Sequence, residues 1–83
     1  MNSIYTISEI DDITAKTNRI NQLFTDNGYI TEVESPMPFH PVVGITQSII
    51  VTNPKNGKRA DFCIGKSDRS DAFCLELIKK SID

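Results

Sequence analysis

The chain has 83 residues, of which 39% are hydrophobic and 24% are charged, and its formal net charge is −2. This composition is typical of one small globular domain and is too apolar for a disordered chain, so we expect a single domain over residues 1–83. No apolar run approaches the roughly 20 residues that a membrane span needs, and the first residues lack the basic and apolar segments of a signal peptide. We therefore expect a cytoplasmic protein that does not act in a membrane.

The first strong pattern along the chain is helical. Residues 9–27 carry apolar side chains at helical spacing, Ser8 can cap the first turn, and Asn27-Gly28 is a typical C-terminal stop. The preceding residues 3–7 are either a short strand or an arm.

Three strands are predicted after this helix, over residues 29–34, 45–52 and 59–64. The first and third alternate between apolar and polar side chains, and the second is apolar on both faces. Between the second and third strands, Pro-Lys-Asn-Gly at residues 54–57 is turn chemistry and predicts a hairpin.

A proline-rich segment separates the first two strands. Three of the four prolines lie within residues 36–41, and since proline fixes φ and lacks an N–H donor, we expect residues 35–41 to be a loop and not sheet. Met37 and Phe39 lie inside this loop. Large apolar side chains there either fold back onto the core or form a contact surface.

A second helix is predicted over residues 69–82, with Ser67 or Asp68 as its cap and a broad apolar face made of Ala72, Phe73, Cys74, Leu75, Leu77, Ile78 and Ile82. The order is therefore α-β-β-β-α. We expect an α+β fold in which two helices pack on one face of a three-stranded antiparallel sheet.

Catalysis and metal binding are not indicated. Cys63 and Cys74 are the two cysteines and His40 is the one histidine, too few for a disulfide framework or a four-ligand zinc site. We expect free, buried thiols, with a mutual disulfide as the alternative, and no metal or cofactor. The glycines are scattered, and no nucleophile stands beside a base, so we expect no enzymatic activity.

The charge is unevenly distributed. Residues 1–54 hold two basic and six acidic residues, and residues 55–83 hold seven basic and five acidic ones. The acidic groups are Glu9, Asp11, Asp12, Asp26, Glu32 and Glu34. The basic groups around the hairpin and the start of the last helix are Lys55, Lys58, Arg59, Lys66 and Arg69. Such a basic cluster either grips phosphates or is simply solvated.

Two short motifs resemble the double-stranded-RNA-binding domain, which has the same element order. Pro38-Phe39-His40 resembles the Pro-x-His of its first strand-to-strand loop, and Gly65-Lys66-Ser67 resembles the G-x-S before its second helix. The resemblance implies that His40, Lys66 and Arg69 contact RNA, through a minor groove and across the phosphates of the major groove.

A second resemblance covers residues 44–82. The segment Gly-Ile-Thr-Gln-Ser-Ile-Ile-Val-Thr-Asn at 44–53, followed by Asn56-Gly57, a strand and a closing helix, is similar to the central meander of small phage proteins, including anti-CRISPR inhibitors of RNA-guided nucleases. That family implies action by binding, in which an acidic surface occupies a site meant for nucleic acid.

The function expected from these observations is non-enzymatic. We expect a small phage or mobile-element accessory protein that binds and inhibits a host or rival protein, itself a nucleic-acid-binding one. The six acidic groups, with Met37 and Phe39, would form the protein-binding surface. The alternative is a nucleic-acid binder that uses His40 and the basic cluster. A self-associating role is the third class, and the sequence leaves the oligomeric state open.

Overall fold

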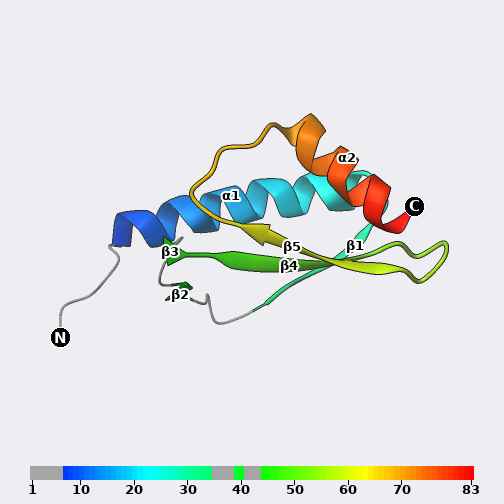
Figure 1. Ribbon diagram of the computed structural model, residues 1–83, viewed down its shortest axis with the longest axis horizontal. Helices are drawn as coiled ribbons and strands as arrows, with labels where there is room; N and C mark the ends of the chain where they lie inside the picture. Colours follow the sequence, from blue (N-terminus) through cyan, green and yellow to red (C-terminus); the bar gives the residue numbers. More distant parts are fainter. Residues whose placement is uncertain (1–6, 35–38, 41–43) are drawn as a thin grey trace.

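The computed structural model describes residues 7–34, 39–40 and 44–83, and Figure 1 shows two helices lying over one side of a sheet. The elements are α1 (Ile7–Asp26), β1 (Ile30–Val33), β2 (Phe39–His40), β3 (Gly44–Ile45), β4 (Gln47–Thr52), β5 (Arg59–Ile64) and α2 (Asp71–Ile82). An antiparallel sheet has the order β1-β4-β5, and β2 pairs with β3 separately. The predicted fold, a three-stranded antiparallel sheet with both helices on one face, is confirmed.

Helix α1 follows the predicted helical spacing. Ile13, Ile20 and Phe24 are buried, and the helix stops where Gly28 adopts φ +91°, a conformation that favours glycine. Its start differs from the prediction, because the helix already begins at Ile7 and Ser8 lies inside its first turn. Ser8 is therefore not the cap.

The sheet has two chemically different faces because side chains alternate along each strand. On β4, Ile49 and Val51 are fully buried beneath the helices, while the neighbouring positions are only partly covered. Phe62 of β5 packs edge-to-face against Phe24 of α1, with ring centroids 5.2 Å apart. The core consists of Ile20, Phe24, Tyr29, Ile49, Val51, Phe62, Ile64, Cys74, Ile78 and Ile82.

The hairpin between β4 and β5 has the predicted turn chemistry. The N–H of Gly57 donates to the carbonyl of Asn53 at 2.8 Å, and Gly57 has φ +74°. The buried side chain of Asn53 also donates to the carbonyl of Ile82 at 3.0 Å. The turn therefore holds the end of α2 as well as joining two strands.

Tyr29 makes a second contact with the end of the chain. Its buried hydroxyl donates to Asp83 Oδ1 at 2.8 Å. Burial, with the hydrogen bond and charge of Asp83, raises the pKa of Tyr29 to about 12, so the phenol stays neutral throughout the physiological range.

The proline-rich segment is not wholly a loop. Phe39 and His40 form strand β2, which pairs with β3 through the partners Phe39↔Ile45 and His40↔Gly44. A two-residue strand fits here because neither residue is a proline, so both keep their backbone donors. Met37 lies outside the described residues, as do residues 1–6, so the predicted strand or arm before α1 and the predicted role of Met37 are not addressed.

Two further element boundaries differ from the prediction. The strand expected over residues 45–52 is divided between β3 and β4 at Thr46. Helix α2 begins at Asp71, and its cap is Ser70, whose Oγ accepts from the N–H of Phe73 at 3.1 Å. Ser67 and Asp68 were expected to cap it, but they lie within the connection that crosses from β5 to α2.

The two-faced sheet predicts unequal responses to one substitution. Ile49→Ala should lower the free energy of unfolding by about 2–5 kcal/mol, because it removes a fully buried side chain from the central strand. Ile30→Ala, in the same sheet but at a side chain that is 59% exposed, should cost about 1 kcal/mol or less. Urea unfolding of both variants measures this; equal losses would contradict the assignment of faces.

Candidate binding surface

The sheet face turned away from the helices is the main candidate site. The register places Glu32 and Asp61 on either side of Ile50, and Ile30 and Arg59 on either side of Thr52. The N–H of Glu34 donates to the carbonyl of Ser48 at 2.9 Å, which extends the pairing by one residue beyond β1. We call this the helix-free face; it consists of Ile30, Glu32, Glu34, Ser48, Ile50, Thr52, Arg59, Asp61 and Cys63.

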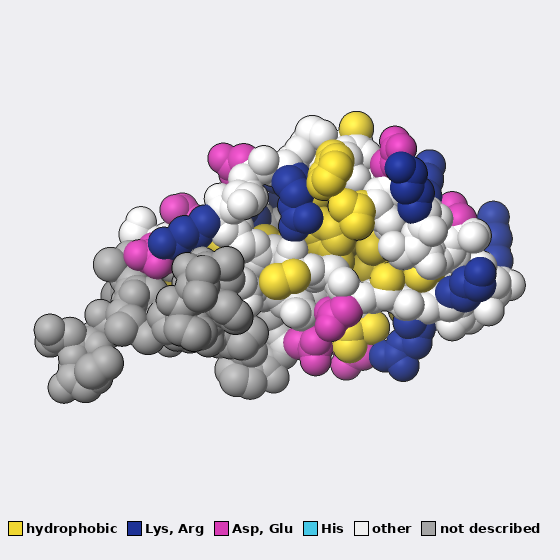
Figure 2. All heavy atoms as spheres, viewed as in Figure 1, with side chains coloured by type: hydrophobic (Ala, Val, Ile, Leu, Met, Phe, Trp, Pro, Cys, Tyr) yellow, Lys and Arg dark blue, Asp and Glu magenta, His cyan; other side chains and the backbone are white. Residues whose placement is uncertain are grey.

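The helix-free face is acidic with an apolar centre. Glu32, Glu34 and Asp61 are exposed, and none of them forms an ion pair with another described residue. Arg59 is the one basic residue on this face and lies beside the hairpin. In Figure 2 acidic side chains gather along the lower edge of the molecule, where the sheet lies in Figure 1.

Backbone pairing and one side-chain contact fix the backbone positions of Glu32 and Glu34 on the sheet. Glu32 is held within the ladder between β1 and β4. Beyond the end of β1, the side chain of Gln47 donates to the carbonyl of Glu34. Gln47 is 4% exposed, so its side-chain amide is buried. Its role could not be predicted from the sequence, because strand alternation does not distinguish an amide that bonds to a neighbouring strand from one that faces solvent.

The other predicted acidic residues lie elsewhere. Glu9, Asp11 and Asp12 are in the first half of α1, and Glu9 Oε2 lies 3.7 Å from the ammonium of Lys66. Asp26 is at the opposite end of this helix, where it accepts from Gln22 at 2.7 Å. The six predicted acids therefore form three separate groups, of which only Glu32 and Glu34 lie on the helix-free face.

The predicted basic cluster is also divided. Lys55 and Lys58 are exposed on the hairpin that precedes β5, and Lys66 lies in the connection that follows the opposite end of β5. Figure 1 shows the hairpin and this connection well apart. Arg59 begins β5 on the helix-free face. His40 lies in β2, and the structure describes its backbone alone, as it does that of Phe39. The described basic residues therefore do not form one continuous surface.

Arg69 is engaged within the protein. Its Nη2 donates to the carbonyl of Cys63 at 2.7 Å, and its guanidinium lies 4.9 Å from the ring centroid of Phe62. These contacts hold the connection against β5. They also compete with any use of Arg69 to bind phosphate.

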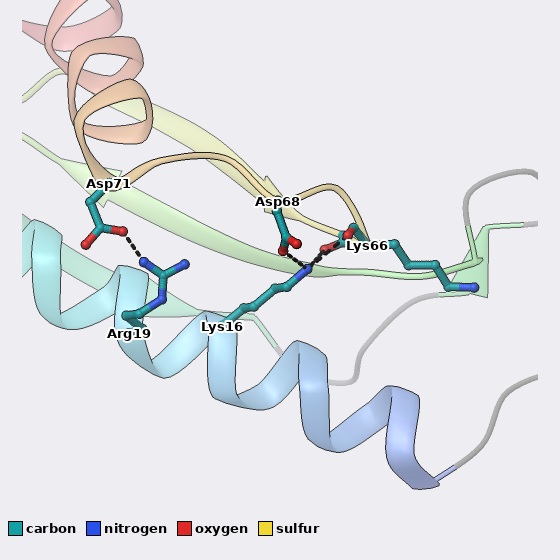
Figure 3. A network of polar contacts seen from close by, with 6 residues as sticks. Lys16, Arg19, Lys66, Asp68 and Asp71 are labelled. Atoms are coloured by element: carbon teal, nitrogen blue, oxygen red, sulfur yellow. Dashed lines mark hydrogen bonds and ion pairs between the residues drawn. The ribbon is translucent and has the colours of Figure 1, made fainter.

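Lys16 holds the same connection from below, as Figure 3 shows. Its ammonium donates to the carbonyls of Gly65 at 3.2 Å and Lys66 at 3.0 Å and lies 3.0 Å from the carboxylate of Asp68. This pairing holds the pKa of Asp68 below its usual range. Next to it, Arg19 pairs with Asp71 at the start of α2. Lys16 and Asp68 thus join α1 to the connection, and Arg19 and Asp71 join α1 to the start of α2.

The two thiols have different environments. Cys74 is buried, as predicted, and burial raises the pKa of its thiol and makes it unreactive. Cys63 is exposed, so the prediction that it is buried is wrong: alternation along β5 places it on the helix-free face. Both thiols are free.

Metal-binding clusters and membrane-spanning helices are both absent from the described part of the chain. Within residues 7–34, 39–40 and 44–83, no group of three or more His, Cys, Asp or Glu residues is arranged to hold a metal ion. In the same part of the chain, neither helix is long and apolar enough to cross a bilayer. Neither a family model nor a curated protein nor a solved structure matches this chain.

The contacts of Lys16 predict a structural role for this cation. Lys16→Met should lower the free energy of unfolding by about 1–2 kcal/mol, because two backbone carbonyls lose a charged donor. Lys55→Met, on the exposed hairpin, is the matched control and should change stability little.

The loss of stability in Lys16→Met should also depend on pH. The pair with Lys16 holds the folded pKa of Asp68 below its ordinary value. The pair therefore stabilises the fold above the ordinary pKa of an aspartate, and this stabilisation is lost as pH falls through the lowered pKa. The difference between wild type and Lys16→Met should therefore shrink in acid. Urea unfolding at neutral and acidic pH tests this. Equal losses in the free energy of unfolding for Lys16→Met and Lys55→Met would contradict the structural role of Lys16.

Proposed function

We propose that this protein acts by binding another protein through the helix-free face, without catalysis. The observation that carries the proposal is the position of Glu32, Glu34 and Asp61 around Ile50 on a sheet face that neither helix covers. These carboxylates have no ion-pair partner within the described part of the chain, unlike Glu9 and Asp68. Their charge is therefore available to a partner.

The chemistry of the face favours a basic partner. Unpaired carboxylates at fixed spacing attract Lys and Arg side chains and increase the rate of encounter. The apolar side chains of Ile30, which is 59% exposed, and Ile50 supply area that can be buried at the centre of an interface. Among proteins, surfaces that bind nucleic acids have the complementary positive charge.

This chemistry is compatible with inhibition by occupation of a nucleic-acid site. The three-stranded sheet fixes the backbone spacing of Glu32 and Glu34, so a partner has to order only their side chains on binding. The resemblance of residues 44–82 to small phage-encoded inhibitors points the same way. The proposed function is thus that of an accessory factor of a phage or mobile element, which binds a host or rival nucleic-acid-binding protein and blocks it.

Nucleic-acid binding receives less support from the geometry. Of the residues implied by the double-stranded-RNA-binding resemblance, Arg69 donates to a backbone carbonyl and Lys66 lies near Glu9. Asp68 and Asp71 stand in the same connection and helix start, where they would oppose phosphates. Nucleic-acid binding is the alternative that the capture experiment below distinguishes from protein binding.

The proposal predicts that charge reversal on β1 abolishes capture of a partner. Tagged wild-type protein and the double variant Glu32→Lys/Glu34→Lys are incubated with a ribonuclease-treated bacterial lysate fraction that binds heparin. Wild type should retain one stoichiometric protein, and the variant should lose it by roughly ten-fold or more, because attraction becomes repulsion. Added double-stranded DNA or RNA should displace the protein from wild type.

The matched control is Asp11→Lys/Asp12→Lys, which changes the charge equally on an exposed part of α1. It should retain the partner. Equal capture by wild type and the β1 variant would refute the helix-free face as the binding surface. Partners that wild type captures from an untreated fraction and loses after ribonuclease treatment would instead favour RNA binding through His40, Lys66 and Arg69.

A further inference from the structure

The outer edge of β5 leaves backbone hydrogen-bonding groups without a partner strand. Because the N–H of Asn53 donates to Lys58, the alternation of an antiparallel ladder turns the N–H and C=O groups of Arg59, Asp61 and Cys63 away from β4. The contact between Arg69 and the carbonyl of Cys63 agrees with this direction. β5 is an edge strand of the described sheet, so Arg59 and Asp61 present a short open edge.

An exposed apolar side chain of α2 lies beside this edge. Leu77 of α2 lines an open groove of about 600 Å³ together with Asp61 and Cys63 of β5. Leu77 is 38% exposed, and Phe73, one helical turn earlier, is 51% exposed. Figure 2 shows hydrophobic side chains at the surface in the middle of this view, where β5 and α2 lie in Figure 1. Both residues belong to the apolar face predicted for this helix, but the structure leaves them partly exposed, and such exposed apolar side chains can form a contact surface.

We infer that two copies of this chain associate through their β5 strands. In an antiparallel pair around a two-fold axis, each residue faces the one equally far from the centre on the other strand. Arg69 already occupies the carbonyl of Cys63, which leaves Arg59 and Asp61 as the free positions. The symmetric register is therefore centred on Ala60. In this register the free backbone N–H and C=O groups of Arg59 face those of Asp61 on the other copy.

The charges on this edge favour the same register. With Ala60 at the axis, Arg59 faces Asp61 of the partner subunit, and the contact occurs twice by symmetry. The register centred on Asp61 instead places two aspartates opposite each other, which is unfavourable. The free backbone hydrogen-bonding groups and the side-chain charges are two independent features, and both favour the register centred on Ala60.

The exposed part of α2 completes the interface. A two-fold axis perpendicular to the sheet keeps the helices of both copies on one side, so the α2 helices approach each other above the paired β5 strands. Leu77 borders the β5 groove and would pack in the new contact. The resulting six-stranded sheet leaves Glu32 and Glu34 of both helix-free faces uncovered, while Asp61 pairs with Arg59 of the partner subunit. The association goes beyond the proposed function and does not depend on it.

A charge-swap series tests the pairing by sedimentation velocity over a range of protein concentrations. Wild type should reach twice the monomer mass of 9.3 kDa as concentration rises. Arg59→Asp and Asp61→Arg should each raise the dissociation constant roughly ten-fold or more, because like charges then face each other twice. The double variant Arg59→Asp/Asp61→Arg should restore dimerisation, because it re-forms both opposite-charge pairs.

Two controls make the result specific. Glu32→Arg matches Asp61→Arg in charge but lies on β1, across the sheet from β5, and should dimerise like wild type. Leu77→Ser should weaken the dimer, and circular dichroism verifies that every variant is folded. Folded wild type that stays at 9.3 kDa throughout overturns the inference and leaves the edge to a strand of another protein. A double variant as weak as the single ones overturns the register.

Discussion

The structure depends on one-sided burial: two helices cover one face of a three-stranded sheet and leave the other face to solvent. Ile49 and Val51 of β4 and Phe62 of β5 point to the helices because alternate residues of a strand share a face. The same alternation then directs Ile50, Asp61 and Cys63 outward. The core and the candidate binding surface are thus set by a single register, and a shift of one residue would exchange them.

Charge is used differently on the two sides of the molecule. On the helix side, Lys16 binds carbonyls of the segment that leads into α2, and Arg19 pairs with Asp71 at the start of α2. Arg69, which belongs to that segment, donates to the carbonyl of Cys63 in β5. These three cations hold the fold together, and their contacts compete with any use of them to bind a polyanion. On the helix-free face, Glu32 and Glu34 have no such internal partner among the described residues and can act on other molecules. Their position, more than the net charge of −2, supports protein binding.

The elements themselves were largely predictable from the sequence. Local patterns placed β5 at residues 59–64 and ended α1 at Asn27-Gly28, because these depend on alternation and turn chemistry. The cap at Ser70 was missed, since several residues before α2 can cap a helix and the path from β5 decides among them. The grouping of charges was missed for a similar reason. Residues close in sequence separate when a hairpin and a crossing connection lie between them.

Reactivity of the two thiols tests the one-sided burial most directly. Cys63 lies on the helix-free face and Cys74 in the core, so a thiol reagent such as 5,5′-dithiobis(2-nitrobenzoate) should label one cysteine per native chain rapidly. The second should react only after denaturation, and peptide mapping should assign the rapid site to Cys63. Rapid labelling of both thiols would contradict a closed core. Protection of both in the native protein would show that the sheet face is covered and unavailable for binding.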